Sequence, residues 1–90
     1  MSRKILKFEA SWCGPCQQLS RSFAANEDWL KKNNVVVEPV DIDNHPDDAT
    51  NHGVRGVPTL IIVDGDREVA RRVGLDSWHR IQEWIVDHYI

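Results

Sequence analysis

The chain has 90 residues, of which 41% are hydrophobic and 28% are charged, with a formal net charge of -3. This length supports one hydrophobic core, so we expect a single domain over residues 1–90, and we expect it to be a monomer. The charge gives no electrostatic reason to bind nucleic acid or an anionic membrane. The sequence has no uninterrupted apolar leader and no stretch long enough to span a bilayer, so we expect a cytoplasmic protein.

The first half of the chain predicts a strand, a long helical region and a second strand. Residues 3–10 alternate between two faces, which is typical of a strand. Apolar residues then recur at helical spacing over 14–34, with 26–28 as a candidate break. The β-branched run 35–40 predicts a buried strand parallel to the first, and Pro39 indicates a sheet edge or a strand end.

The next segment predicts a short helix and a β-hairpin. Pro46 and the acidic residues after it fit a helix start, and Gly53 fits its end. A third strand begins at Val57-Pro58 and is uniformly apolar after its first residues. Asp64-Gly65 is a strong turn signal, so the strand that ends near Val73 is expected to be antiparallel to the third.

A last helix follows Gly74, with Asp76 or Ser77 as its cap and one apolar stripe along its length. The order of elements is therefore β-α-β-α-β-β-α. This order predicts an α/β fold with a four-stranded mixed sheet and helices on both faces. A right-handed first crossover places the turn at Cys13 at the carboxyl end of the first strand, where α/β folds present their sites.

The segment Trp12-Cys13-Gly14-Pro15-Cys16 holds the only two cysteines, spaced for one reversible disulfide. Glycine allows a tight turn, proline suits the first turn of a helix, and tryptophan offers an apolar surface. A helix that begins at Gly14 points its unpaired N–H groups at the Cys13 sulfur and favours the thiolate. We therefore expect Cys13 to attack a disulfide of another protein, and Cys16 to displace the reduced product.

Other uses of the cysteine pair are less consistent with the sequence. Two buried core thiols would not need Gly-Pro between them, and a disulfide across so short a loop restricts the unfolded chain little. A metal site needs about four ligands. The four histidines are scattered and are expected to face solvent: His45, His52, His79 and His88. We expect no metal and no cofactor besides the disulfide itself.

Gly56-Val57-Pro58 forms a second local signature. A proline that opens an apolar strand cannot donate a ladder hydrogen bond, so it requires a turn, a bulge or a cis bond. The residues alone leave cis and trans open, and trans is the commoner state. A cis bond that faces the cysteines would leave the Val57 backbone free to pair with an extended substrate segment.

These segments also carry a resemblance to a known family. The cysteine segment, the run Gly53-Val54-Arg55-Gly56-Val57-Pro58-Thr59-Leu60, and Val73-Gly74 follow the order and approximate spacing of thioredoxins. The chain resembles a thioredoxin from residue 3 onward, which implies a thioredoxin-like fold. Thioredoxins usually carry a further strand and helix before the strand that leads to the cysteines, and only a few residues precede it here. The chain therefore resembles a short, minimal thioredoxin.

The resemblance implies a protein-disulfide reductase and electron carrier that works in cell redox homeostasis. Its implied partners are a flavin-dependent thioredoxin reductase as electron donor and disulfide-containing proteins such as ribonucleotide reductase as clients. It also implies that the Val57-Pro58 bond is cis. The catalytic residues are expected to be Cys13 and Cys16, and the substrate-binding residues to be Trp12, Gly14, Pro15, Val57, Pro58 and Gly74.

Lys7 and Glu9 depart from the family pattern. Lys7 stands where most thioredoxins have a buried aspartate that exchanges protons with the resolving cysteine, Pro39 replaces its usual lysine partner, and Glu9 replaces an aromatic residue. In one interpretation both side chains lie beneath the cysteines as pKa modulators, and the pair shuttles a proton. In the other, both reach solvent at a thinly covered edge. We prefer the second by a narrow margin.

Two alternative functions remain open beside the thioredoxin-type reductase. A glutaredoxin-like enzyme would draw electrons from glutathione; the small size and Gly74-Leu75-Asp76 favour it, whereas Gly-Pro between the cysteines and Gly56 before Val57 argue against it. A non-catalytic binding module would use the apolar rim alone. The intact cysteine pair argues against that module, because a scaffold does not need both sulfurs.

Overall fold

The computed structural model describes residues 2–90 and places four strands in one mixed sheet, in the order β2-β1-β3-β4. β1 (Arg3–Glu9) lies between β2 (Val37–Asp41) and β3 (Thr59–Asp64), and β4 (Arg67–Val73) forms the other edge. β2 runs parallel to β1, while β3 is antiparallel to both β1 and β4. The predicted mixed sheet and its hairpin are confirmed.

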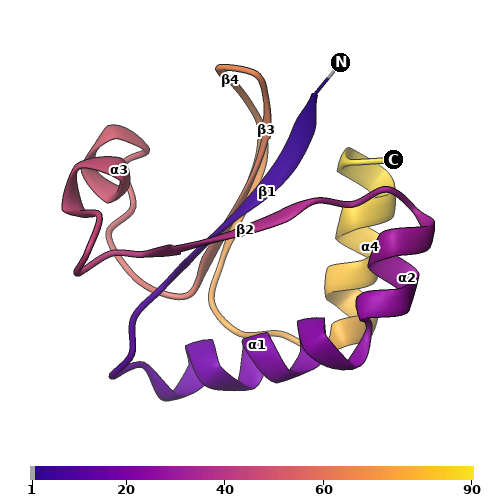
Figure 1. Cartoon of the computed structure of the whole chain (residues 1–90), viewed down its shortest axis with the longest axis horizontal. Helices are drawn as coiled ribbons and strands as arrows, with labels where there is room; N and C mark the ends of the chain where they lie inside the picture. The colour runs from indigo at the N-terminus through magenta and orange to yellow at the C-terminus, as the bar shows by residue number, and fades with distance from the viewer. Residues whose placement is uncertain (1) are drawn as a thin grey trace.

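Helices cover both faces of the sheet, as predicted. α1 (Gly14–Ala25), α2 (Glu27–Lys32) and α4 (Trp78–His88) pack on one face, and α3 (Pro46–Asn51) lies on the other (Figure 1). The predicted helical region divides at Asn26, whose backbone (φ -114°, ψ 22°) leaves the helical range and starts a second helix. None of these helices in residues 2–90 is long and apolar enough to cross a membrane.

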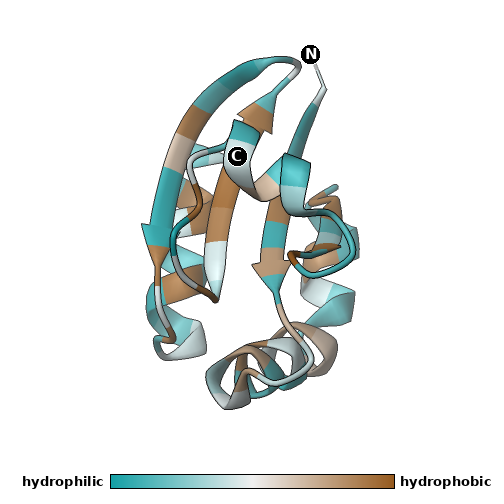
Figure 2. Ribbon diagram, turned by 90° about the vertical axis from the view of Figure 1, so that its left-hand side faces the viewer, coloured by the Kyte–Doolittle hydropathy of each residue, from teal (hydrophilic) through white to brown (hydrophobic). Residues whose placement is uncertain are grey.

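Two hydrophobic layers hold the sheet to its helices. The larger layer joins β1 and β3 to α1, α2 and α4, and its buried members are Ile5, Leu19, Phe23, Leu30, Val35, Leu60, Ile62, Ile81 and Ile85. The smaller layer lies under α3 and contains Leu6, Phe8, Val40, Ile61 and Val63. The hydrophobic residues of β3 form a nearly continuous brown band, whereas β4 is mostly teal (Figure 2). The continuous hydrophobic pattern of β3 is expected for a strand that is covered on both faces.

The second strand differs from its prediction. The run 35–40 was expected to be a buried strand, but β2 begins at Val37 and only Val40 within it is buried. The reason is its position at the sheet edge, where one side of the strand has no neighbour. Pro39 fits this position, since an edge strand tolerates a missing N–H donor.

Candidate functional site

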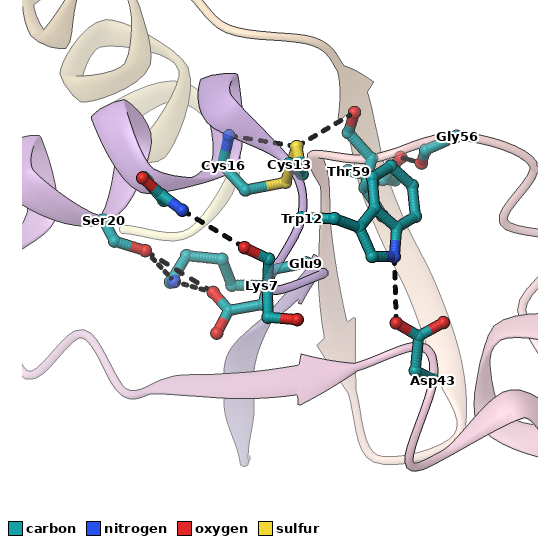
Figure 3. The surroundings of a disulfide bond; sticks show 12 residues. Lys7, Glu9, Trp12, Cys13, Cys16, Ser20, Asp43, Gly56 and Thr59 are labelled. Atoms are coloured by element: carbon teal, nitrogen blue, oxygen red, sulfur yellow. Dashed lines mark hydrogen bonds and ion pairs between the residues drawn. A yellow bond between two sulfur atoms is a disulfide. The ribbon is translucent and has the colours of Figure 1, made fainter.

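The two cysteines lie where β1 leads into α1, at the carboxyl end of the strand. Cys13 is the N-cap of α1 with an extended backbone, Pro15 occupies the first helical turn, and Cys13 and Cys16 are joined as a disulfide with their Cα atoms 5.2 Å apart. The backbone N–H of Cys16 donates to the Cys13 Sγ at 3.1 Å (Figure 3). An N-terminal N–H group and the positive end of the helix dipole are thus directed at the Cys13 sulfur, which favours negative charge there.

The sulfurs are buried while their neighbours are exposed. Cys13 and Cys16 are 5% and 3% exposed, whereas Trp12 is 68% exposed, and Gly14 and Pro15 are exposed as well. A partner therefore meets the surface formed by Trp12, Gly14 and Pro15 as it approaches the disulfide.

The loop before β3 faces the cysteines, and its Val57–Pro58 peptide bond is cis, as the resemblance implied. The carbonyl oxygen of Val57 lies 3.8 Å from the Cys13 Sγ. The backbone N–H of Gly74 donates to the carbonyl of Pro58 at 2.8 Å, and Gly74 has a φ of +95°, a conformation that glycine adopts readily. The loops at residues 57 and 74 are therefore held together beside the disulfide. The strand itself begins at Thr59 rather than at Val57-Pro58.

Trp12 is fixed by a residue that the sequence reasoning did not select. Its indole Nε1–H donates to Asp43 Oδ2 at 2.9 Å (Figure 3). Asp43 follows β2 just as Trp12 follows β1, and the ends of parallel strands meet at one edge of a sheet. The predicted parallel pairing was therefore a signal that could have placed Asp43 near Trp12.

Lys7 is buried, so the preferred expectation that it reaches solvent is wrong. The residue is 6% exposed, and its ammonium donates to the Ser20 Oγ at 2.8 Å and forms an ion pair with Glu9 Oε1. Across the parallel pair Lys7 stands opposite Pro39, which has no polar side chain, so Glu9 and Ser20 supply the partners. The Glu9 side chain is 28% exposed. The reason for the burial is that α1 covers this part of β1.

Ser20 was also missed by the sequence reasoning. It lies four residues after Cys16 on α1, so helical spacing places both on one face, and this spacing was visible in the sequence. Ser20 and Cys16 line one cleft of about 490 Å³ together with Glu9. The full lining of this cleft is Glu9, Ala10, Ser11, Cys16, Gln17, Ser20, Arg21 and Asp41.

The histidines take no part in this site. Within residues 2–90 no group of three or more His, Cys, Asp or Glu side chains is arranged to hold a metal ion. His79 is exposed and pairs with Glu83 on α4. His52 differs from its prediction, because it is half-buried against the ring of Phe8, with ring centroids 5.6 Å apart.

Comparisons with known proteins agree on one family. The family profile Thioredoxin matches residues 2–87. The chain is 39% identical over 84 residues to a thioredoxin of Chlamydia caviae, covering 93% of this chain and 80% of the relative. It is 33% identical over 78 residues to a thioredoxin of Rhodospirillum rubrum, covering 87% and 74%. A solved mutant thioredoxin from Halobacterium salinarum superposes with a TM-score of 0.84 at 31% identity, covering 98% of this chain and 75% of that one.

Proposed function

The chain belongs to the thioredoxin family and is a thiol-disulfide oxidoreductase, and we propose that it reduces disulfides of other proteins with Cys13 as nucleophile and Cys16 as resolving thiol. In the first step the Cys13 thiolate attacks a substrate disulfide, and one substrate sulfur leaves as a thiolate. In the second, Cys16 attacks the Cys13 sulfur and releases the other substrate sulfur. Two electrons pass to the substrate, and the Cys13–Cys16 disulfide forms.

The observation that carries this assignment is the hydrogen bond from the Cys16 N–H to the Cys13 Sγ at the start of α1. The N-cap sulfur receives the stabilisation that a thiolate needs, and a stabilised thiolate is the attacking species. Cys16 lies one turn further into the helix and is buried, which suits a thiol that acts only within the mixed disulfide.

We assign substrate binding to the surface around the sulfurs. Trp12, Gly14 and Pro15 form one side of this surface, and Val57, Pro58 and Gly74 form the other. An extended segment of the substrate would lie between the two sides and pair with the Val57 backbone, as in strand addition.

For partners, the family supplies disulfide-containing substrates and a thioredoxin reductase. We propose that ribonucleotide reductase is among the clients and that the protein works as a monomer. We also propose that it works in the cytoplasm, because a reductant of protein disulfides requires a compartment that keeps thiols reduced.

The test is reduction of insulin by dithiothreitol with and without the protein. Acceleration is expected for the wild type and should be lost in Cys13→Ser. Cys16→Ser, reduced beforehand and mixed with insulin in the absence of dithiothreitol, should still attack and accumulate as a mixed disulfide with the substrate. If the wild type gives no acceleration, the binding-module interpretation replaces this one. Turnover driven by NADPH and thioredoxin reductase, but not by glutathione and its reductase, would distinguish the thioredoxin type from the glutaredoxin type.

A further inference from the structure

The carboxylate of Glu9 shares a cleft with the resolving cysteine. It lies on the last position of β1 and lines the same cleft as Cys16 and Ser20. The cleft has a volume of about 490 Å³, and because a water molecule occupies about 30 Å³ in the liquid, it has room for water. A transfer of a proton between the two side chains therefore does not require their direct contact.

The position of this carboxylate is fixed from two sides. The buried ammonium of Lys7 pairs with Glu9 Oε1, and the Ser20 hydroxyl, which accepts from Lys7 at 2.8 Å, lies 3.5 Å from the same oxygen. Within residues 2–90 these contacts all use Oε1, so Oε2 is available to accept a proton. Figure 3 shows Lys7, Glu9 and Ser20 grouped beneath the disulfide.

The other charged groups around the cleft fit this role less well. Asp41 on β2 also lines it, but its carboxylate already accepts the backbone N–H of Asp43 at 2.9 Å. Arg21 on α1 is a cation and has no site that accepts a proton. Among residues 2–90, Asp41 and Arg21 are thus the other charged residues that line the cleft, and Lys7 contacts Glu9 from β1 itself.

We infer that Glu9 accepts the proton of the Cys16 thiol in the resolving step, with Lys7 and Ser20 as positioning residues. The Cys16 proton moves through water to Glu9. The resulting thiolate attacks the Cys13 sulfur, the bond between Cys13 and the substrate breaks, and the substrate leaves as a thiolate with the electron pair. When the disulfide is later reduced, Glu9 returns the proton to Cys16. This inference rests on the proposed role of Cys16.

The experiment is a stopped-flow reaction of the reduced protein with dithiobis(nitrobenzoate), which releases one coloured thiolate when Cys13 attacks and a second when Cys16 resolves. In Glu9→Gln at neutral pH, the first release should keep its rate and the second should slow by about tenfold. This loss is below the ~10²–10⁴-fold typical of general acid–base catalysis, because water can still accept the proton. At alkaline pH hydroxide removes the thiol proton, so the difference from wild type should narrow to less than about twofold.

The matched control is Glu38→Gln, which changes an exposed carboxylate paired with Lys4 on the neighbouring strand and should leave both rates unchanged. If Glu9→Gln is poorly folded, Lys7→Met/Glu9→Gln removes both charges of the pair and should show the same slow second release. Equal second rates in Glu9→Gln and Glu38→Gln, or a deficit that persists at alkaline pH, would overturn the inference about Glu9. Absence of any second release from the wild type would instead overturn the proposed role of Cys16.

Discussion

Replacing Lys7 and replacing Glu9 should destabilise the protein by different amounts, although the two side chains form one ion pair. The Lys7 side chain is 8% exposed and the Glu9 side chain is 28% exposed. Replacing one partner leaves the other charge without its counter-ion, and the cost depends on how well water reaches that charge. The appropriate test is therefore a double-mutant cycle with Lys7→Met, Glu9→Gln and the double variant.

The magnitudes follow from these exposures. Glu9→Gln leaves a buried ammonium with only neutral acceptors, the Ser20 hydroxyl and the new amide oxygen, and should lower the free energy of unfolding by about 3 kcal/mol. Lys7→Met leaves a carboxylate that water can reach, and should lower it by about 1 kcal/mol. The double variant contains no buried charge and should lie within about 1 kcal/mol of wild type. The coupling energy is then about 4 kcal/mol.

The assay is urea unfolding of the oxidised proteins at neutral pH, with the pair of Lys4 and Glu38 as the matched control. These side chains are 43% and 51% exposed and lie 3.3 Å apart. Because water surrounds both charges, the coupling energy in the cycle with Lys4→Met and Glu38→Gln should be below about 1 kcal/mol.

A cost for Glu9→Gln no larger than that for Glu38→Gln would refute this reasoning. It would mean that water reaches the Lys7 ammonium in spite of its burial. Additive costs in the Lys7 and Glu9 cycle would lead to the same conclusion, since the two charges would then act independently.

Three further predictions concern the fold. Ile62→Ala empties a fully buried position in β3 and should lower the free energy of unfolding by about 2–5 kcal/mol, measured by urea unfolding. Ser77→Ala removes the Oγ that accepts the Arg80 N–H at the start of α4 and should cost about 1 kcal/mol in the same assay. The hydrogen bonds from Arg71 lower the pKa of Glu68, so their stabilisation is present above the ordinary pKa of 4.5 and is lost as pH falls through the lower folded value. Glu68→Gln should therefore cost a few tenths of a kcal/mol at neutral pH, because water screens this pair, and nothing at strongly acidic pH; an equal cost at both pH values would contradict the assignment.

Much of this protein could be predicted from local sequence patterns. Alternation along 3–10, the Asp64-Gly65 turn and a cap at Asp76 or Ser77 depend on residues close together in the chain. The structure has β1, the hairpin and α4 at these places, with Ser77 as the cap. The cysteine segment predicted the sulfurs at the N-terminus of a helix for the same reason. Its glycine, proline and spacing determine the local backbone there without reference to distant residues.

The tertiary structure alone decided which polar residues are buried and which of them meet. Lys7 and Glu9 lie on one face of β1, as two polar residues would on an exposed strand. Only the packing of α1 over this face shields Lys7 from water and brings Ser20 into contact with it. Trp12 meets Asp43 because two parallel strands end at one edge. Burial and contacts of this kind depend on surfaces contributed by residues far apart in the chain. Periodicity shows which side of a strand a residue occupies, and the covering of that side is determined when the helices pack against the sheet.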